Sequence, residues 1–366
     1  MIFPSQWVHC IHVVTAQNTN SISMRICFFA NMTNHANWRE MFETVEFYKV
    51  DIEILKSLGH EVVLAGDFKS LDKTADLYYC WWWTYAFYPI LRSLPNRRPV
   101  IVTGAFDYDT CHGVIPGLCY LNRPLWQKWL MKFALKCATR NLFISQCEYD
   151  LVTQHLPVRN PVLSPLAINT AYYNPGSDVA QRGDYFFTVS WSSSTNAKRK
   201  CLDSIIEAFG RAAHVRPNLR LVMAGKKGDH YDSLVALTRE AGVEDRVDFV
   251  GMISDEEKRD HYRRCLAYVQ PTLFEGFGHA IGEAIACGAQ IITSPSGAVP
   301  EVAGTHARFV TPNDVEQLAQ AMLEVADTPV DPAMQAAQLR HIEANFSIEQ
   351  RRKQLADILD SVRLSR

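Results

Sequence analysis

The sequence of 366 residues has no long hydrophobic run, no strong charge of either sign and no cysteines at metal-binding spacing. No run approaches the roughly 20 apolar residues of a membrane-spanning helix. The formal net charge of −2 offers no overall attraction to nucleic acid, so no nucleic-acid partner is expected. The ten cysteines include no C-x-x-C pair, which indicates buried thiols in a reducing compartment. We therefore expect a globular, cytoplasmic protein.

Residues 1–23 also lack the features of a signal peptide. The short apolar stretch from Trp7 to Val14 is interrupted by histidines, and no lysine or arginine precedes it. Met24 then opens the segment MRICFFA, which is typical of a first buried strand. We therefore interpret residues 1–23 as an N-terminal extension or as the product of a misplaced start.

Strand and helix patterns alternate along the rest of the chain. The first half predicts strands at 26–30, 61–65, 77–80, 100–103 and 142–144, with helices around 45–55 and at 124–137. The second half predicts strands at 185–190, 219–224, 247–251, 267–270, 290–293 and 307–310, with helices at 201–213, 231–241, 255–265, 279–287 and through 313–363. This alternation is typical of parallel sheets covered by helices on both faces.

The length and one irregular stretch divide the chain into domains. A chain of this length usually forms more than one core, and the proline-rich stretch 159–178 lacks periodicity. We predict an α/β fold of two doubly wound, Rossmann-like domains facing a cleft. Residues 24–165 would form the first domain and residues 166–345 the second. Residues 346–366 would form a last helix that packs back on the first domain or simply ends the second.

The stretch FEGFGHAIGEAIACG, residues 274–288, carries the strongest functional signal. Glu275 and Glu283 flank a glycine cluster between a predicted strand and a predicted helix. The free N–H groups and the dipole at a helix start favour an anion, and glycine lets a ligand approach the backbone. A carboxylate can accept hydrogen bonds from sugar hydroxyls. The pattern predicts a site for ribose, diphosphate and sugar in one line, and the alternative is a strand–loop–helix corner with exposed glutamates.

This stretch resembles the E-x7-E motif of retaining GT-B glycosyltransferases, specifically glycosyltransferase family 4. SGAVPEVAG (296–304), FVGMISDEEKRDHYRRC (249–265) and YFFTVSWSSSTNAKRKCLDSIIEAF (185–209) also follow the family's order and spacing. The resemblance covers about residues 185–310, and the amino half shares only the architecture. It implies a retaining enzyme that moves a sugar from a nucleotide-diphosphate donor to a hydroxyl of a glycan or lipid-linked sugar. No metal or other cofactor is implied.

The resemblance also implies roles for matching residues. Glu283 would bind the nucleotide ribose, and Glu275 would face the donor sugar. Backbone N–H groups around Gly276, Phe277 and Gly278 would bind the sugar and its phosphates.

Lys200 matches the lysine that neutralises the diphosphate. A solvated lysine within the basic run is the alternative. The family's glycine–arginine pair is replaced by Ser190 and Trp191, and Arg199 is the candidate substitute for the missing arginine.

Three residues after strands are candidates for the nucleotide end. Gly251 and Met252 follow one predicted strand and would lie near the nucleobase. Gly225 ends another strand that faces the cleft, although both glycines also suit ordinary turns.

The amino half offers weaker candidates in IVTGAFDYDTCHGV, residues 101–114. Asp107 and Asp109 form a D-x-D triplet, which holds a divalent metal in another class of glycosyltransferase, but a three-residue match is weak. Asp107 and Asp109 could instead orient the acceptor hydroxyl. His112 is the nearest candidate for the histidine that family members place near the reacting sugar.

Residues 78–99 combine three consecutive tryptophans with arginines. Three interpretations stay open: buried core, a carbohydrate-stacking wall, or a peripheral contact with the inner face of the membrane. Two alternatives to a transferase also stay open. One is a sugar-nucleotide epimerase or phosphorylase of the same fold, and the other is a non-catalytic nucleotide- or sugar-binding protein.

Overall fold

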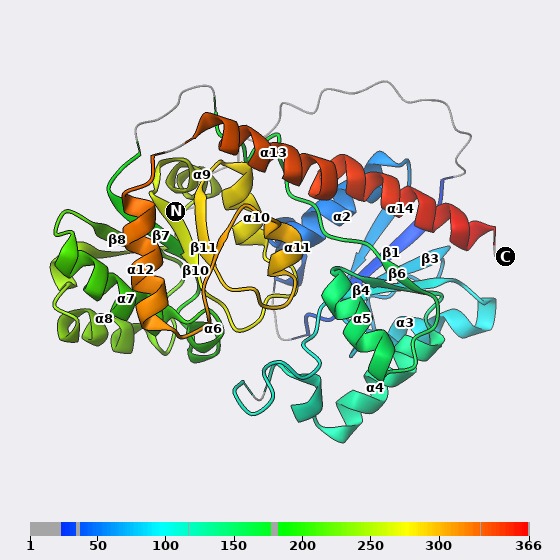
Figure 1. Ribbon diagram of the computed structural model, residues 1–366. Helices are drawn as coiled ribbons and strands as arrows, with labels where there is room; N and C mark the ends of the chain where they lie inside the picture. The colour runs from blue at the N-terminus through cyan, green and yellow to red at the C-terminus, as the bar shows by residue number, and fades with distance from the viewer. Residues whose placement is uncertain (1–22, 34–36, 116, 177–181, 330, 365–366) are drawn as a thin grey trace.

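The computed structural model describes residues 23–33, 37–115, 117–176, 182–329 and 331–364. The extension predicted for residues 1–23 therefore lies almost wholly outside the described residues. Within them, the chain forms two six-stranded parallel sheets, one in each half of the molecule (Figure 1). None of the described helices is long and apolar enough to cross a membrane.

The first sheet has the strand order β2-β1-β3-β4-β5-β6. Its strands are β1 (Arg25–Ala30), β2 (Glu61–Ala65), β3 (Leu77–Trp81), β4 (Val100–Gly104), β5 (Arg140–Phe143) and β6 (Pro161–Leu163). Its helices are α1 (Trp38–Thr44), α2 (Glu46–Ser57), α3 (Phe87–Ser93), α4 (Leu125–Cys137) and α5 (Gln146–His155), with 3-10 turns η1 (Leu94–Asn96) and η2 (Tyr120–Asn122).

The second sheet has the strand order β12-β11-β10-β7-β8-β9. Its strands are β7 (Tyr185–Val189), β8 (Arg220–Ala224), β9 (Val247–Gly251), β10 (Ala267–Gln270), β11 (Gln290–Thr293) and β12 (Arg308–Phe309). The helices of this half are α6 (Ser194–Arg199), α7 (Leu202–Val215), α8 (Tyr231–Glu240), α9 (Asp255–Arg264), α10 (His279–Ala286), α11 (Val299–Ala303) and α12 (Val315–Ala326), with the 3-10 turn η3 (Glu244–Arg246). Two last helices, α13 (Pro332–Phe346) and α14 (Ile348–Arg363), end the described chain.

Burial on both faces explains why the strands read as continuous apolar runs. Along β1, Ile26 and Phe28 join one hydrophobic cluster, whereas Cys27 and Phe29 join another. A strand that contributes to two cores has no polar face, so apolar residues do not alternate with polar ones.

The predicted elements are confirmed, most to within two residues, except that the continuous helix predicted for 313–363 is divided into α12, α13 and α14. Several elements were missed. The helix predicted around 45–55 is α2, and Gly59 follows it with a positive φ of 86°, as a helix terminator should. The missed helices are α1, α3, α5, α6 and α11. The prediction that residues 159–178 lack regular structure was wrong in part, because β6 lies there and pairs with β5.

The three tryptophans do not form one surface. Trp81 and Trp83 are fully buried in the first domain, and Trp83 stacks on Phe143. Trp82 lies between them, is half-buried, and donates a hydrogen bond from its indole nitrogen to the hydroxyl of Tyr48. The interpretation of this tryptophan run as a membrane patch is therefore wrong for two of its three members, which are core.

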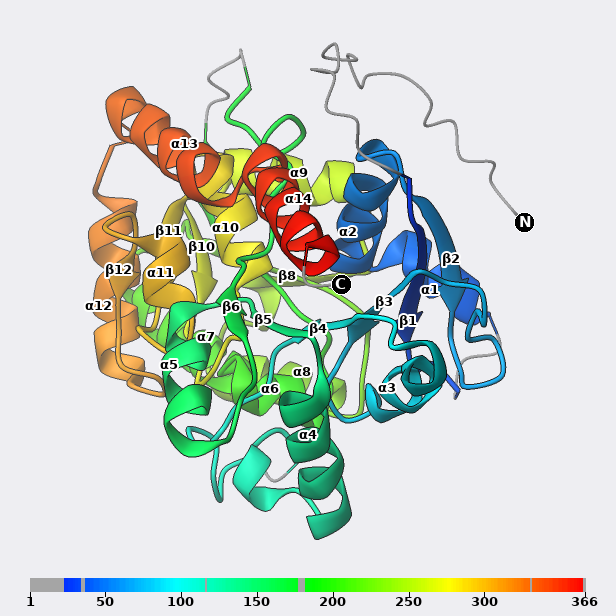
Figure 2. The same ribbon diagram turned by 90° about the vertical axis from the view of Figure 1, so that its right-hand side faces the viewer.

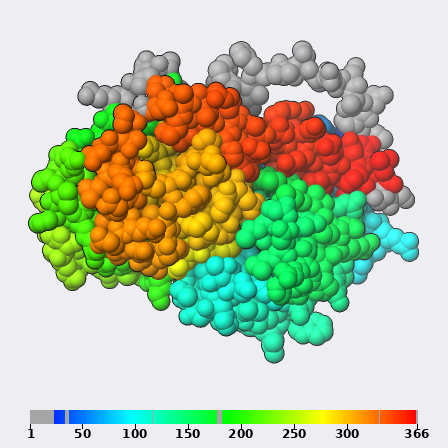
Figure 3. All heavy atoms as spheres, in the orientation of Figure 1, coloured from blue at the N-terminus to red at the C-terminus, as the bar shows by residue number. Residues whose placement is uncertain are grey.

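Helix α14 returns from the second half and packs against α2 of the first (Figure 2). Arg351 of α14 forms a buried bidentate ion pair with Asp51 of α2, at 3.0 Å for each N–O distance. Tyr79 of β3 donates its hydroxyl to the same carboxylate. The space-filling view shows α13 and α14 as one orange-to-red band along both halves (Figure 3).

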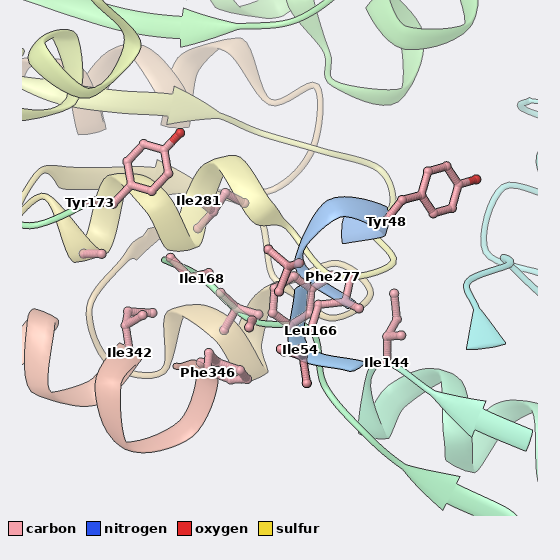
Figure 4. Close-up of a cluster of buried hydrophobic side chains, with 14 of the residues drawn as sticks. Tyr48, Ile54, Ile144, Leu166, Ile168, Tyr173, Phe277, Ile281, Ile342 and Phe346 are labelled. Carbon is pink, nitrogen blue, oxygen red and sulfur yellow. The ribbon is translucent and has the colours of Figure 1, made fainter. Parts of the chain in front are cut away.

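A hydrophobic cluster also joins the two halves. Figure 4 shows Ile54 of α2 close to Phe277 of the second half, with Ile144 on one side of them and Phe346 on the other. Leu166, in the connecting segment, lies among them. The segment between the sheets is thus part of a shared core rather than a free linker.

The loops after β4 and β10 meet where the two sheets face each other with their carboxyl ends. A Cβ built on Gly276 would lie 2.7 Å from the Cβ of Ala105. Cys111 and Ile115 pack with Phe274 in a small separate cluster. This junction is where ligands of doubly wound sheets bind, because the carboxyl edges carry the open loops.

Candidate functional site

Glu275 is held in place by two side chains of the second half. Arg199, the last residue of α6, places Nη1 2.6 Å from Glu275 Oε1, and both side chains are largely buried. Gln270, at the end of β10, donates its amide to the same oxygen at 2.9 Å. Of the two candidate cations, Arg199 is therefore the one paired with this carboxylate.

Lys200 lies beside this pair and contacts neutral acceptors. Its Nζ donates to Gln270 Oε1 at 3.0 Å and to the Val189 carbonyl at 3.3 Å. Burial lowers the pKa of Lys200 to about 8, and the nearby Glu275 carboxylate opposes this shift. An ammonium group among neutral acceptors has little charge compensation, so a bound anion would stabilise it.

Glu283 lies inside α10 and is nearly inaccessible to solvent. Lys258 of α9 places Nζ 3.2 Å from Glu283 Oε2, and the Tyr262 hydroxyl donates to the same oxygen at 3.2 Å. Burial raises the pKa of Glu283, and Lys258 opposes the shift. The Glu283 carboxylate also raises the pKa of Lys200 and so acts against the effect of burial.

The start of α10 has the expected form. Gly278 precedes the helix with a φ of 93°, and no side chain caps the helix start. His279 opens the helix, and burial lowers the pKa of this imidazole to about 4, which keeps it neutral. Its Nε2 has no hydrogen-bond partner among the described residues. Phe277 itself points into the shared core, where it packs on Phe346, so only its backbone can serve the site.

A small cavity lies at the carboxyl ends of β7, β8 and β9. Six of its lining residues are Thr188, Ser190, Ser192, Gly225, Tyr231 and Gly251. A Cβ on Gly225 would lie 1.9 Å from the Ser190 carbonyl oxygen, so only glycine fits there. Met252 does not line this cavity, and its side chain is 77% exposed.

In the amino half, Asp107 is used to close its own loop. Its carboxylate accepts the N–H groups of Thr110 at 2.9 Å and Cys111 at 2.7 Å. The D-x-D pair therefore does not present two free carboxylates. No cluster of three or more His, Cys, Asp or Glu side chains that could hold a metal was found in the described part of the chain.

Asp109 and His112 are exposed on this loop. The imidazole Nδ1 of His112 lies 3.0 Å from Asn122 Oδ1. Neither side chain forms a hydrogen bond or ion pair with a described residue of the second half. The loop reaches that half through Cys111 and Ile115 instead.

Three residues of this constellation were not predicted: Lys258, Tyr262 and Gln270. Gln270 gave a usable signal, because a glutamine ends an otherwise apolar strand, AYVQ, on the carboxyl edge of the sheet. Lys258 and Tyr262 lie four residues apart on α9 and so share one face, but nothing in the sequence says which face meets α10.

The second half of the chain resembles a known protein family. Residues 188–341 match the family described as glycosyl transferases group 1. The matched segment contains Lys200, Glu275 and Glu283, and it covers most of the second half.

Two curated relatives extend the likeness toward the amino half. The gpi3 subunit of phosphatidylinositol N-acetylglucosaminyltransferase from Schizosaccharomyces pombe is 26% identical over 270 residues, which is 68% of this chain. The match spans 58% of that relative's length. The O-antigen chain mannosyltransferase RfbU of Salmonella typhimurium is 24% identical over 298 residues, covering 77% of this chain and 81% of RfbU.

Solved structures confirm the fold. A sucrose-phosphate synthase from Thermosynechococcus elongatus superposes with a TM-score of 0.74 at 16% identity, over 94% of this chain and 100% of the synthase chain. The fold is GT-B, as the sequence predicted.

Proposed function

We propose that the protein is a retaining glycosyltransferase of family 4 that takes a sugar from a nucleotide-diphosphate donor. One observation carries the proposal: Arg199 and Lys200 lie beside Glu275, with Glu283 close by, at an uncapped helix start. Cations and free N–H groups suit the diphosphate, and the two carboxylates suit hydroxyl groups on either side of it.

The residues of the second half would divide the donor between them. The phosphates would be held by the side chains of Lys200 and Arg199. They would also be held by the backbone N–H groups from Gly276 to Gly278 and at the start of α10. Glu283, with Lys258 beside it, would bind the ribose hydroxyls. The cavity bordered by Gly225 and Gly251 would take the nucleobase, with Met252 at its exposed margin.

In the reaction, the acceptor oxygen forms a bond to the anomeric carbon as the bond from that carbon to the phosphate oxygen breaks. The acceptor proton passes to the departing phosphate, on the same face of the sugar. Fixed positive charge at the leaving diphosphate stabilises charge as it develops. Glu275 already forms an ion pair with Arg199 and accepts a hydrogen bond from Gln270, which suits an orienting role rather than a nucleophilic one.

The candidate residues for the acceptor lie in the first half of the chain. The acceptor would be a hydroxyl of a glycan or a lipid-linked sugar, and Asp109 and His112 would lie on its side of the junction. The enzyme would act in the cytoplasm, peripheral to the inner face of a membrane. No metal or other cofactor is part of the proposal.

A donor-hydrolysis and transfer screen tests the proposal. Uridine, guanosine and adenosine diphosphate sugars are offered with and without a glycan or lipid-linked acceptor, and with and without a chelator. We expect one donor to be consumed with retained anomeric configuration, and chelator to have no effect. Epimerised donor, or phosphate-dependent cleavage, would identify the alternative enzymes, and nucleotide binding without turnover would identify a binding protein.

Glu275→Ala separates sugar orientation from nucleotide binding. We expect transfer to fall by at least about a hundredfold, while the Kd for the nucleoside diphosphate changes by less than about threefold, since the carboxylate would contact only the sugar. Glu240→Ala is the matched control, because Glu240 is an exposed glutamate at the end of α8. Parallel loss of transfer and nucleotide binding in Glu275→Ala would contradict the assigned role.

A further inference from the structure

Helix α4 presents an apolar face to solvent. Leu125 is 76%, Trp126 56% and Trp129 76% exposed. No other helix or strand in the described ranges carries three exposed large apolar side chains. The opposite face of α4 is buried through Met131 and Leu135, so the helix is anchored and its outer face is fixed. Exposed apolar groups gathered on one element mark an interaction surface rather than random surface variation.

The same face continues into lysines. Lys132 and Lys136 lie seven and eleven residues after Leu125, which is helical spacing, and both are exposed. The wider segment 110–147 contains no aspartate or glutamate. Its five basic residues are Arg123, Lys128, Lys132, Lys136 and Arg140. Since the whole chain has a net charge of −2, this segment is +5 and the remainder is −7.

The helix is also linked to the candidate site. Lys128 Nζ donates to the Leu121 carbonyl at 2.7 Å, which ties α4 to the end of the preceding loop. That loop begins at Ala105, beside Gly276, and it carries Asp109 and His112. Figures 1 and 2 both show α4 at the lower end of the first domain, and the teal atoms of this region form the lower surface in Figure 3.

We propose that α4 docks the protein on a membrane that contains anionic lipids. The tryptophans and Leu125 enter the interface between headgroups and acyl chains, and the lysines pair with anionic headgroups. The strong local excess of positive charge, in a chain that is otherwise acidic, favours an anionic bilayer over an apolar protein groove. The inference extends the proposed function, because a docked α4 would bring the loop with Asp109 and His112 to a membrane-resident acceptor.

Sedimentation with vesicles tests the docking. Vesicles of phosphatidylcholine with 30% phosphatidylglycerol are compared with pure phosphatidylcholine at about 0.15 M salt. We expect binding to the anionic vesicles and little binding to the neutral ones. Lys132→Gln with Lys136→Gln should weaken binding by roughly 30-fold, from about 1 kcal/mol for each lysine near the surface. Trp126→Ser with Trp129→Ser should weaken it at least tenfold on the same vesicles.

The controls keep docking and catalysis apart. Val215→Ser with Lys353→Glu removes an exposed apolar side chain and an exposed lysine elsewhere, and it should bind vesicles as the wild type does. Donor hydrolysis in solution should be unchanged in both α4 variants. Vesicle binding without donor turnover would support the docking of α4 and contradict only the proposed transferase activity.

Two results would overturn the docking itself. One is a wild-type protein that stays in the supernatant with anionic vesicles while it hydrolyses donor. The other is a dimer in solution that Trp126→Ser with Trp129→Ser dissociates, because α4 would then be covered by a second copy of the chain.

Discussion

The lowered pKa of Lys200 predicts that the affinity for the donor falls as the pH rises through about 8. Burial lowers the pKa of Lys200 to about 8 in the free protein. A diphosphate binds the ammonium form and not the neutral amine, so binding requires the proton. Below pH 8 the proton is already present. Above pH 8 it must be taken up on binding, and the affinity falls.

The magnitude follows from the fraction of charged lysine. With a pKa of about 8, the amine is about 90% charged at pH 7 and about 10% charged at pH 9. The apparent Kd for the nucleoside diphosphate should therefore rise about tenfold between these pH values, or about 1.4 kcal/mol. The phosphates contribute nothing to this change, because their last pKa lies near 6.

Titration calorimetry measures both the Kd and the number of protons taken up on binding. At pH 9, binding should take up about 0.9 proton, seen as a dependence of the heat on the buffer's ionisation enthalpy. Lys200→Arg should bind with the same Kd at both pH values, since a guanidinium stays charged. Lys200→Met should bind the nucleoside diphosphate weakly, with the same Kd at both pH values. A wild-type Kd that changes by less than about twofold, with no proton uptake, would refute the assignment of Lys200 to the diphosphate.

Two further predictions concern packing. Arg351→Met leaves the buried Asp51 carboxylate unpaired and should lower the free energy of unfolding by about 3–5 kcal/mol in urea, whereas Arg352→Met, at a 41% exposed arginine, should cost less than about 1 kcal/mol. Equal decreases in the free energy of unfolding for the two variants would mean that the buried ion pair with Asp51 stabilises the fold no more than an exposed arginine does. Gly225→Ala should abolish nucleotide binding and destabilise the fold, because its Cβ would lie 1.9 Å from the Ser190 carbonyl oxygen. Gly242→Ala also has a positive φ but open space around it, so it should cost only about 1–2 kcal/mol and leave binding unchanged.

The fold could be predicted because both sheets are buried on two faces. Strands such as β10 then appear as apolar runs, and the helices between them keep helical spacing. The missed helices α1 and α6 are short, at seven and six residues, and give too few turns for a periodic pattern. Strand β6 was hidden because Pro161 opens it and Pro165 follows it. A proline is tolerated at the first residue of a strand at the edge of the sheet.

The site could be predicted only where residues lie close in the chain. Glu275 and Glu283 share one loop and helix, so their spacing was informative. The partners of these carboxylates, Arg199 and Lys258, come from different helices, and only the folded sheet decides which cation meets which acid. The position of Asp109 and His112 relative to the glutamates depends on how two domains dock, which local sequence does not encode.

The ion pair between Asp51 and Arg351 also has a consequence for biosynthesis. Its two partners are 300 residues apart, so the carboxylate leaves the ribosome long before its arginine. At about 5–20 residues per second, the wait is roughly 15–60 seconds. During that interval the nascent first sheet carries an unneutralised acid where α14 will later pack. The first half can therefore bury this carboxylate with its partner only after the last helix has been made.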